Sequence, residues 1–144
     1  MDGINKLFKG FKIASSALRA ERTRVDTIAK NIANAQTTYT PETGTAYRRE
    51  IVHFQPILER MEGGGHEVTG VQVSGIEQDM NTPFDEVHDP SHPDADAQGI
   101  VKYPNVNTMH EMADLITAVR AYEANINVQD TFERMAQRAL RLGQ

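Results

Sequence analysis

The sequence predicts an α+β protein in which long N- and C-terminal helices pair as a coiled-coil-like unit, with a small β-rich module between them. Three observations predict it. Apolar residues recur every seven positions through the first part of the chain, apolar and polar residues alternate in the middle, and the last 37 residues contain no proline. These patterns place an N-terminal helix in residues 1–38, a β-rich module with irregular loops in 39–107, and a C-terminal helix in 108–144.

The N-terminal segment carries a seven-residue apolar repeat of the kind found in coiled coils. One series is Ile4, Phe11, Leu18, Val25 and Ile32, and a second, three residues later, is Leu7, Ala14, Ile28 and Ala35. Only Glu21 interrupts the second series. A helix of thirty-odd residues extends about 50 Å, at 1.5 Å per residue. A domain of this size cannot cover that length, so we expect this helix to need a partner.

The middle segment changes to a period of two, which predicts strands at 47–58 and 68–76 joined by a turn at Gly63-Gly64-Gly65. Residues 100–103 are expected to add a short strand. The segments 36–46 and 81–99 are expected to be irregular, and the second of them holds Pro83, Pro90 and Pro93.

The C-terminal helix is predicted to begin at Thr108, with Glu111 three residues on as its capping-box partner. Its apolar residues form two series that differ in register. The first is Met112, Leu115, Val119, Tyr122 and Ile126, and the second is Val128, Phe132, Met135, Ala139 and Leu142. Two series imply that the helix contacts different neighbours along its length. The alternatives are a helix that drifts around a single neighbour and a helix buried on two sides within one domain.

Composition and charge exclude several classes of protein. The chain has no cysteine, which excludes disulfides, thiolate metal sites and cysteine nucleophiles. Its net charge of −5 combines +4 in residues 1–38 with −8 in residues 39–108, which argues against a nucleic-acid-binding protein. No apolar run is long enough to span a bilayer, and residues 1–6 lack the apolar core of a signal peptide. We therefore expect a cytoplasmic protein or one exported without a cleaved signal peptide.

The residues of chemically reactive or metal-binding types do not form a recognisable site. The triple glycine precedes a strand rather than a helix, so it is not a phosphate-binding loop. Pro90 opposes the helix that a metal-binding pair of His88 and His92 needs. The acidic run that begins at Asp94 has Asn105 where a calcium loop needs glutamate. We expect no catalytic residue, metal, cofactor or small-molecule substrate, and an enzyme built on the acidic loop is a distant third possibility.

Two polar motifs fit none of these catalytic, phosphate-binding or metal-binding sites. Asn31-Ile32-Ala33-Asn34 stands where the first apolar repeat ends, and Arg120-Ala121-Tyr122-Glu123-Ala124-Asn125 lies in the C-terminal helix. Asparagine side chains can bond freed carbonyl groups or fix the register of a helix contact. Ordinary capping and an exposed polar face are the alternatives.

These motifs resemble those of the flagellar axial proteins. In that family the first helix ends in an Asn-x-Ala-Asn motif, matched by Asn31-Ile32-Ala33-Asn34. A Tyr-Arg pair then leads into a strand, matched by Tyr47-Arg48, and the chain closes with an Arg-x-Tyr-Glu-Ala-Asn helix and a terminal Leu-Gly. The segment from Asp89 to Val106, the short length and the small middle module resemble the proximal-rod branch in particular. The resemblance extends over nearly the whole chain.

The resemblance implies a structural subunit of the bacterial flagellar basal body, found in the periplasmic rod. Such subunits polymerise through both terminal helices into the axial drive shaft that transmits torque. The implied partners are other rod proteins, further copies of the chain, the adaptor between the membrane ring and the rod, and the type III export apparatus. The alternative is a soluble helical adaptor or export chaperone that dimerises in the cytoplasm through the same helix faces.

The apolar repeats and the polar motifs together give a set of expected assembly contacts. These are Leu7, Phe11, Leu18, Val25, Ile28, Asn31, Ile32, Asn34, Val119, Arg120, Tyr122, Asn125, Ile126 and Phe132.

Overall fold

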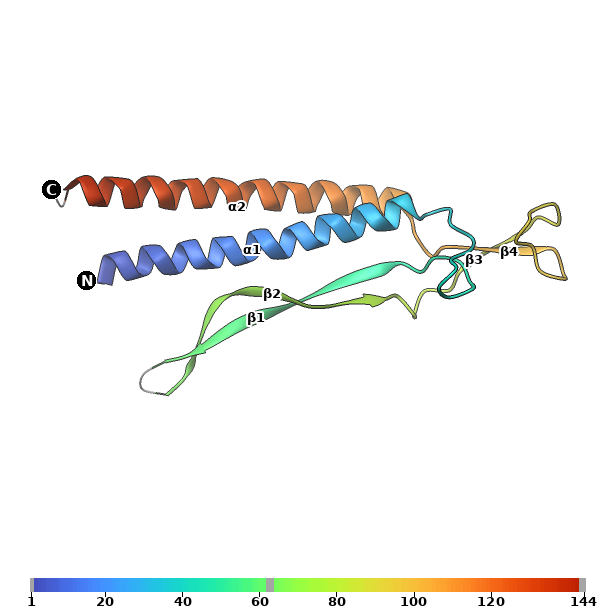
Figure 1. Cartoon of the computed structure of the whole chain (residues 1–144), viewed down its shortest axis with the longest axis horizontal. Coiled ribbons are helices and arrows are strands. Elements are labelled where there is room, and N and C mark those ends of the chain that lie inside the picture. Colours follow the sequence, from blue (N-terminus) through green and yellow to red (C-terminus); the bar gives the residue numbers. More distant parts are fainter. Residues whose placement is uncertain (1, 62–63, 143–144) are drawn as a thin grey trace. The chain divides into compact units, whose positions relative to one another are not determined.

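The computed structural model describes the backbone of residues 2–61 and 64–142, and the side chains of residues 8–61 and 64–141. The elements follow one another as α1 (Asp2–Ala33), β1 (Glu50–Arg60), β2 (His66–Gln78), β3 (Asp85–His88), β4 (Ile100–Tyr103) and α2 (Thr108–Leu142) (Figure 1). Strands β1 and β2 form one two-stranded sheet and strands β3 and β4 another. The predicted α+β class, with long helices at both ends of the chain, is confirmed.

The chain divides into two compact units. Unit 1 comprises Met1–Val25, His53–Gly75 and Thr117–Gln144, and unit 2 comprises Asp26–Val52 and Ile76–Ile116. Both helices and both strands of the first sheet contribute residues to each unit. None of the described helices combines the length and the apolarity that crossing a bilayer demands.

In unit 1, small side chains let α1 pack closely against its neighbours. Ala14, Ser16 and Ala20 are buried. The Ser16 hydroxyl accepts a hydrogen bond from the backbone N–H of Val71 at 3.0 Å and donates one to the carbonyl of Ile13 at 2.7 Å. Gly70 lies against this serine, because a Cβ atom at position 70 would stand 2.6 Å from the Ser16 Oγ. The hairpin therefore lies on α1 at a point where neither chain has a bulky side chain.

Ion pairs and an aromatic contact complete unit 1. Lys9 pairs with Glu67 and Lys12 with Glu59, so two basic residues of α1 contact the two strands of the hairpin. On α2, the ring of Phe132 lies over Gly10 of α1, so close that a Cβ atom at Gly10 would overlap it. The absence of a side chain at Gly10 lets the two helices approach at this point.

In unit 2, strands β3 and β4 pair antiparallel, with Asp85 opposite Tyr103 and His88 opposite Ile100. Val101 on β4 is completely buried, and Ile28 of α1 is almost completely buried. Gly99 adopts a φ of 77° at the entrance to β4, a conformation that side-chain-bearing residues rarely adopt. The buried side chains of this unit also include four polar ones, Thr27, Asn31, Asn105 and Glu111.

Three local predictions were wrong. Residues 85–88 were expected to be irregular, but they form β3, whose polar side chains carry no hydrophobic alternation and which is defined by its pairing with β4. The first strand begins at Glu50 rather than at Tyr47. The helix cap is Asn107, not Thr108, because the Asn107 side-chain oxygen accepts hydrogen bonds from the backbone N–H groups of Met109 and His110.

The turn predicted at Gly63-Gly64-Gly65 is confirmed for Gly64 and Gly65. Residue 63 lies outside the described residues. Gly64 and Gly65 both have positive φ angles, and the N–H of Met61 donates a hydrogen bond to the carbonyl of Gly65 at 3.0 Å. The short strand predicted at residues 100–103 is also confirmed, as β4.

Candidate functional site

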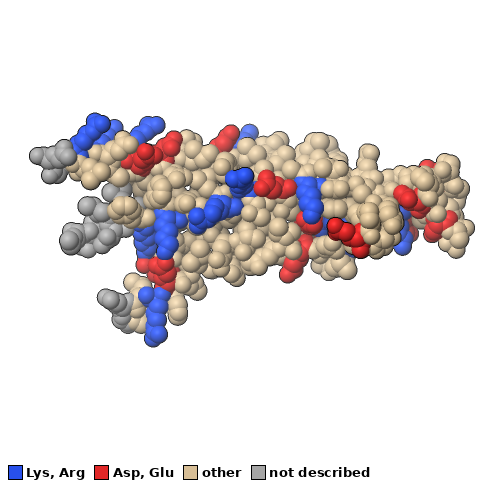
Figure 2. Space-filling view, in the orientation of Figure 1, with Lys and Arg blue, Asp and Glu red and all other residues tan. Residues whose placement is uncertain are grey.

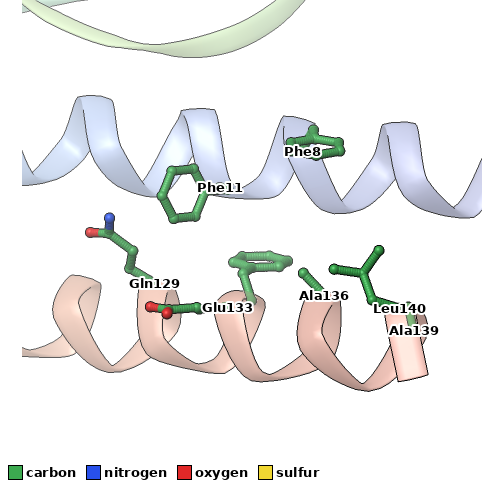
Figure 3. A pocket seen from close by; sticks show the side chains of 8 residues that line it. Phe8, Phe11, Gln129, Glu133, Ala136, Ala139 and Leu140 are labelled. Atoms are coloured by element: carbon green, nitrogen blue, oxygen red, sulfur yellow. The ribbon is translucent and has the colours of Figure 1, made fainter. Parts of the chain in front are cut away.

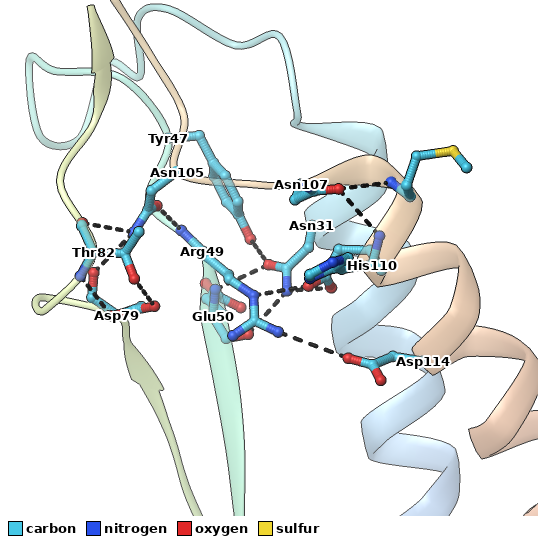
Figure 4. A network of polar contacts seen from close by, with 12 residues as sticks. Asn31, Tyr47, Arg49, Glu50, Asp79, Thr82, Asn105, Asn107, His110 and Asp114 are labelled. Atoms are coloured by element: carbon cyan, nitrogen blue, oxygen red, sulfur yellow. Dashed lines mark hydrogen bonds and ion pairs between the residues drawn. The ribbon is translucent and has the colours of Figure 1, made fainter.

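Asn31, near the end of α1, is the centre of a polar cluster in unit 2 (Figure 4). Its side-chain oxygen accepts hydrogen bonds from the Tyr47 hydroxyl at 2.8 Å and from the backbone N–H of Glu50 at 2.9 Å. Its side-chain nitrogen donates to the carbonyl of Glu50 at 2.9 Å and to Oε2 of Glu111 at 3.0 Å. An asparagine amide has two donor and two acceptor positions, so Asn31 is fully bonded. It joins α1, the start of β1 and the first turn of α2.

Glu111 is a carboxylate with only 1% of its surface exposed. Its Oε1 accepts a hydrogen bond from Arg49 Nε at 2.7 Å, and a second guanidinium nitrogen of Arg49 lies 3.9 Å from the Asp114 carboxylate. Removing one partner of such a buried pair typically costs about 3–5 kcal/mol, because a buried charge is left uncompensated. Glu111 was predicted to cap the helix, and it instead holds α2 to the Arg49 side chain.

Tyr47 is the buried donor of the cluster. Burial raises the pKa of its hydroxyl above the usual range, and the negative charges of Glu50 and Glu111 add to that increase. The hydroxyl therefore stays protonated and donates to Asn31 throughout the physiological range. The Lys30 ammonium lies 6.0 Å from the centre of the Tyr47 ring and pairs with the Glu50 carboxylate at 2.5 Å.

Asn105, in the loop before α2, bonds the loop that follows β2. Its side-chain oxygen accepts from the backbone N–H of Arg49 at 2.9 Å, and its nitrogen donates to the carbonyls of Asp79 and Thr82, each at 3.0 Å. Arg48 donates to the same carbonyl of Asp79 at 2.9 Å and stacks over the Phe84 ring at 4.1 Å. Three chain segments that are distant in sequence are thus joined by side-chain hydrogen bonds to backbone groups.

This cluster holds separate segments of the chain together. Its carboxylates and cations are bonded to one another or to backbone groups. Within the described ranges, no group of three or more histidine, aspartate or glutamate side chains could hold a metal ion. We call Asn31, Tyr47, Arg49, Asn105 and Glu111 the polar cluster from here on.

The terminal helices carry the second part of the candidate site, which is apolar surface left open. On α1 the second apolar series faces inward, since Ala14 and Ile28 are buried, while Leu18, Val25 and Ile32 of the first series are only half-buried and Phe11 is exposed. On α2, Leu115 and Tyr122 are half-buried, and Met112, Val119 and Ile126 are exposed. Each helix therefore has an apolar side that its own subunit does not cover.

An open groove of about 340 Å³ lies between the two helices in unit 1 (Figure 3). Phe8 and Phe11 line it from α1, and α2 contributes Gln129, Phe132, Glu133, Ala136, Ala139 and Leu140. Phe8 and Leu140, at 68% and 71% exposed, are far more open than core side chains. Small alanines between large, open apolar residues are typical of a surface that receives side chains from another helix.

The structure separates the predicted site residues into two groups. Asn31 and Asn34 lie in unit 2, where Asn31 is in the polar cluster and Asn34 bonds the carbonyl of Lys30 and the hydroxyl of Thr37. Arg120, Tyr122 and Asn125 lie in unit 1, where Arg120 is exposed and Asn125 bonds the carbonyl of Ala121 in its own helix. Asn34 and Asn125 therefore make only local hydrogen bonds within the subunit. The side chain of Leu7 lies outside the described residues.

Sequence reasoning missed Arg49, Asn105 and Glu111 as members of the cluster. Asn105 was noted as the residue that rules out a calcium loop and as part of a segment with a family resemblance, and Glu111 was placed in a local cap. Both contacts join residues more than 50 positions apart, and spacing along one chain cannot reveal such pairs.

Two family models match parts of this chain. Residues 11–38 match the family described as "Flagella basal body rod protein", and residues 97–142 match "Flagellar basal body rod FlgEFG protein C-terminal". The two matched ranges include Asn31, Asn105 and Glu111 of the polar cluster and most of both helices.

Curated relatives align over almost the whole chain. The flagellar basal-body rod protein FlgC of Bacillus subtilis is 36% identical, over 94% of this chain and 97% of its own length. FlgC of Borreliella burgdorferi is 40% identical over 93% and 95%, and FlgC of Salmonella typhimurium is 39% identical over 93% and 96%. The chain therefore belongs to the FlgC family of flagellar basal-body rod proteins.

Proposed function

We propose that this chain is a structural subunit of the flagellar basal-body rod and that it polymerises through the open apolar faces of its terminal helices. The similarity to FlgC over more than nine-tenths of both chains carries the first part of the proposal. The exposure of Phe11, Val119 and Ile126 supports the second part, because monomeric proteins rarely leave such continuous apolar faces open.

The mechanism follows from the physics of helical assembly. Contacts between unlike surfaces of identical subunits generate a filament when the rotation between subunits does not close. Each apolar side chain that becomes fully buried stabilises the assembly by about 1.5–3 kcal/mol. The polar cluster holds the ends of both helices in unit 2, so that load on either helix reaches a rigid, fully bonded centre. A subunit built in this way suits transmission of torque along the rod.

The finer assignments are also proposals. We place the chain in the proximal, periplasmic part of the rod, exported unfolded by the type III apparatus without a cleaved signal peptide. Its partners would be other rod proteins, further copies of itself and the adaptor at the membrane ring. These assignments rest on the resemblance to the flagellar axial family. A soluble adaptor or chaperone is not favoured, because the relatives are rod proteins.

Purification of detergent-resistant basal bodies from the source cells tests the location. We expect mass spectrometry to find this chain in them together with other rod proteins. Detection only in the cytoplasm of flagellated cells would contradict the proposal and would favour the adaptor.

A matched pair of variants tests the assembly faces. Leu18→Asp places a charge on the half-buried apolar face of α1, whereas Leu18→Met keeps an apolar side chain at the same position. We expect Leu18→Asp to abolish rod assembly while the protein is still produced, and Leu18→Met to assemble. Normal rod number and motility in the Leu18→Asp strain would refute the role of this face.

A further inference from the structure

Three apolar side chains in the first turns of α2, within unit 2, are exposed to solvent. Met109, Met112 and Ile116 are 74%, 49% and 56% exposed. Their spacing of three and four residues puts them on one side of the helix. Glu111, between them in sequence, is buried in the polar cluster, so the same two turns have one bonded side and one open side. We call these three residues the methionine stripe.

The chemistry of the methionine stripe suits contact with another helix. Methionine side chains are flexible and polarizable, and they adapt to the shape of an apolar partner. Single exposed apolar residues are ordinary on protein surfaces, whereas a row of three large ones is not. The partner must therefore offer apolar side chains of its own. The sign of the partner's charge can be inferred from the net charge of the unit that carries the stripe.

The two units differ strongly in charge. By sequence, unit 2 has 12 acidic and four basic residues, a net charge of −8, whereas unit 1 has eight acidic and 11 basic residues, a net charge of +3. In Figure 2, blue side chains gather on the surface of unit 1, and red ones are prominent around β3 and β4 in unit 2. The methionine stripe thus lies in an acidic unit and suits a basic, apolar partner.

Helix α1 has this combination of properties. Phe8 and Phe11 are exposed, as are Arg19 and Arg22. Steps of three and four residues connect all four positions, so they share one face of the helix. The described part of α1 in unit 1, residues 8–25, carries five basic residues and one acidic residue. Its open face is both apolar and positively charged.

We propose that the methionine stripe is the docking site for helix α1 of a second copy of this chain. The contact joins unit 2 of one subunit to unit 1 of the next, with apolar side chains at its centre and opposite charges around it. Because the two surfaces differ, the contact can repeat from one subunit to the next, and it builds a filament when the rotation between subunits does not close. This inference rests on the proposed rod function and names one of its interfaces.

Photo-cross-linking in rod-forming cells tests the contact. A photoreactive phenylalanine replaces Met112 in one strain and Met80 in a second. Met80 is the matched control, since it is 72% exposed in unit 2 but lies outside the stripe and outside any helix. We expect the probe at position 112 to give a product of twice the subunit mass, mapped by mass spectrometry to residues 8–22 of a second copy. The probe at position 80 should not give this product.

The outcomes separate this contact from the proposed function. Adducts from position 112 to a different protein, or to another segment of the second copy, would overturn the docking site while the chain remains a rod component. The same adduct from position 80 would also overturn it. Absence of the chain from purified basal bodies would overturn the rod function and the contact together.

A charge exchange provides an independent test. The double substitution Met109→Lys and Met112→Lys places positive charges against the basic face of α1, so assembly should fall about tenfold or more because like charges repel in the contact. Adding Arg19→Glu and Arg22→Glu to the same chain should restore part of it, whereas Met80→Lys should leave assembly unchanged. Failure of the added pair to restore assembly, with the subunit still folded by circular dichroism, would refute the pairing.

Discussion

At the scale of single residues, Asn31 makes the hydrogen bonds on which the stability of unit 2 most depends. All four hydrogen-bonding positions of its amide are occupied, and its partners come from three separate segments of the chain. Leaving buried partners unbonded costs about 1–3 kcal/mol for each group. Substitution of Asn31 should therefore cost more than substitution of any other asparagine in the two polar motifs.

We expect Asn31→Asp to destabilise unit 2 by about 3 kcal/mol or more, because it removes two donors and places a second carboxylate beside Glu111. Asn34→Asp is the control, since Asn34 contacts only the end of its own helix and Thr37. Its expected cost is about 1 kcal/mol or less. Thermal unfolding followed by circular dichroism compares the two, and equal losses would contradict the central role of Asn31.

At the scale of elements, the hairpin is held to α1 by close backbone contact as well as by ion pairs. Gly70 has the buried Ser16 hydroxyl 2.6 Å from where its Cβ would stand, and that hydroxyl is fixed by two hydrogen bonds. Gly75, in the same strand, has no atom within 4 Å of the corresponding position. Alanine substitutions at Gly70 and Gly75 therefore compare a closely packed site with an open one in the same strand.

Gly70→Ala should destabilise unit 1 by about 1–3 kcal/mol, as overpacking of a closed contact does. Gly75→Ala should be neutral or slightly stabilising, because alanine restricts the unfolded chain and meets nothing in the folded one. Hydrogen exchange of the hairpin amides reports on both variants. A Gly70→Ala hairpin as protected as the original would show that α1 can move aside.

The turn after β2 should make unit 2 sensitive to acid. The backbone N–H and the hydroxyl of Thr82 donate to the Asp79 carboxylate, with the N–H of Asn81 also contributing, and these bonds lower its pKa below the usual value of 3.8. A lowered pKa stabilises the folded state above pH 3.8, and this stabilisation is lost as the pH falls through the pKa of the folded state.

Asp79→Asn should therefore be less stable than the original chain near neutral pH and no less stable below the pKa of the folded carboxyl group. Thermal unfolding measured at a series of pH values compares the two proteins. A stability difference that is constant with pH would contradict a role for the Asp79 charge.

Much of this arrangement could be predicted from the sequence, and the reasons for the exceptions are physical. Both helices and the first hairpin have apolar periods that report directly on local structure. Strand β3 has no such period, because Asp85, Glu86 and His88 are polar and exposed. Asn31 stood out by its motif, but its bonds to Glu111 join positions 80 residues apart, and a local cap was the nearest explanation for that glutamate.

At the scale of the whole molecule, the distribution of apolar surface separates folding from assembly. The polar cluster and the buried alanines are complete within one chain, whereas the faces that include Phe11, Val119 and Ile126 are not covered by it. The apolar repeats predicted which side chains lie on these faces. The repeats could not predict which of these side chains are buried within the subunit and which are left open for a neighbour. An apolar residue gives the same sequence periodicity whether its own subunit or another one covers it.

Ile126→Asp should prevent rod assembly without unfolding the subunit, because Ile126 is exposed before assembly and a buried unpaired charge opposes it afterwards. Asn127→Asp adds the same charge one residue away, on an exposed polar position. Counting basal bodies by electron microscopy distinguishes the two strains. Equal rod numbers would mean that this side of α2 faces no neighbour.

The bonding of Asn31 also has a spectroscopic consequence. Asn31 is 1% exposed and both hydrogens of its side-chain amide are donated within the subunit, so the two resonances of this NH₂ group should exchange with water far more slowly than those of exposed asparagines. They should also lie away from the crowded region where free side-chain amides resonate. One pair of peaks in an NMR spectrum would then report whether unit 2 is folded in a free subunit, with no label or added probe.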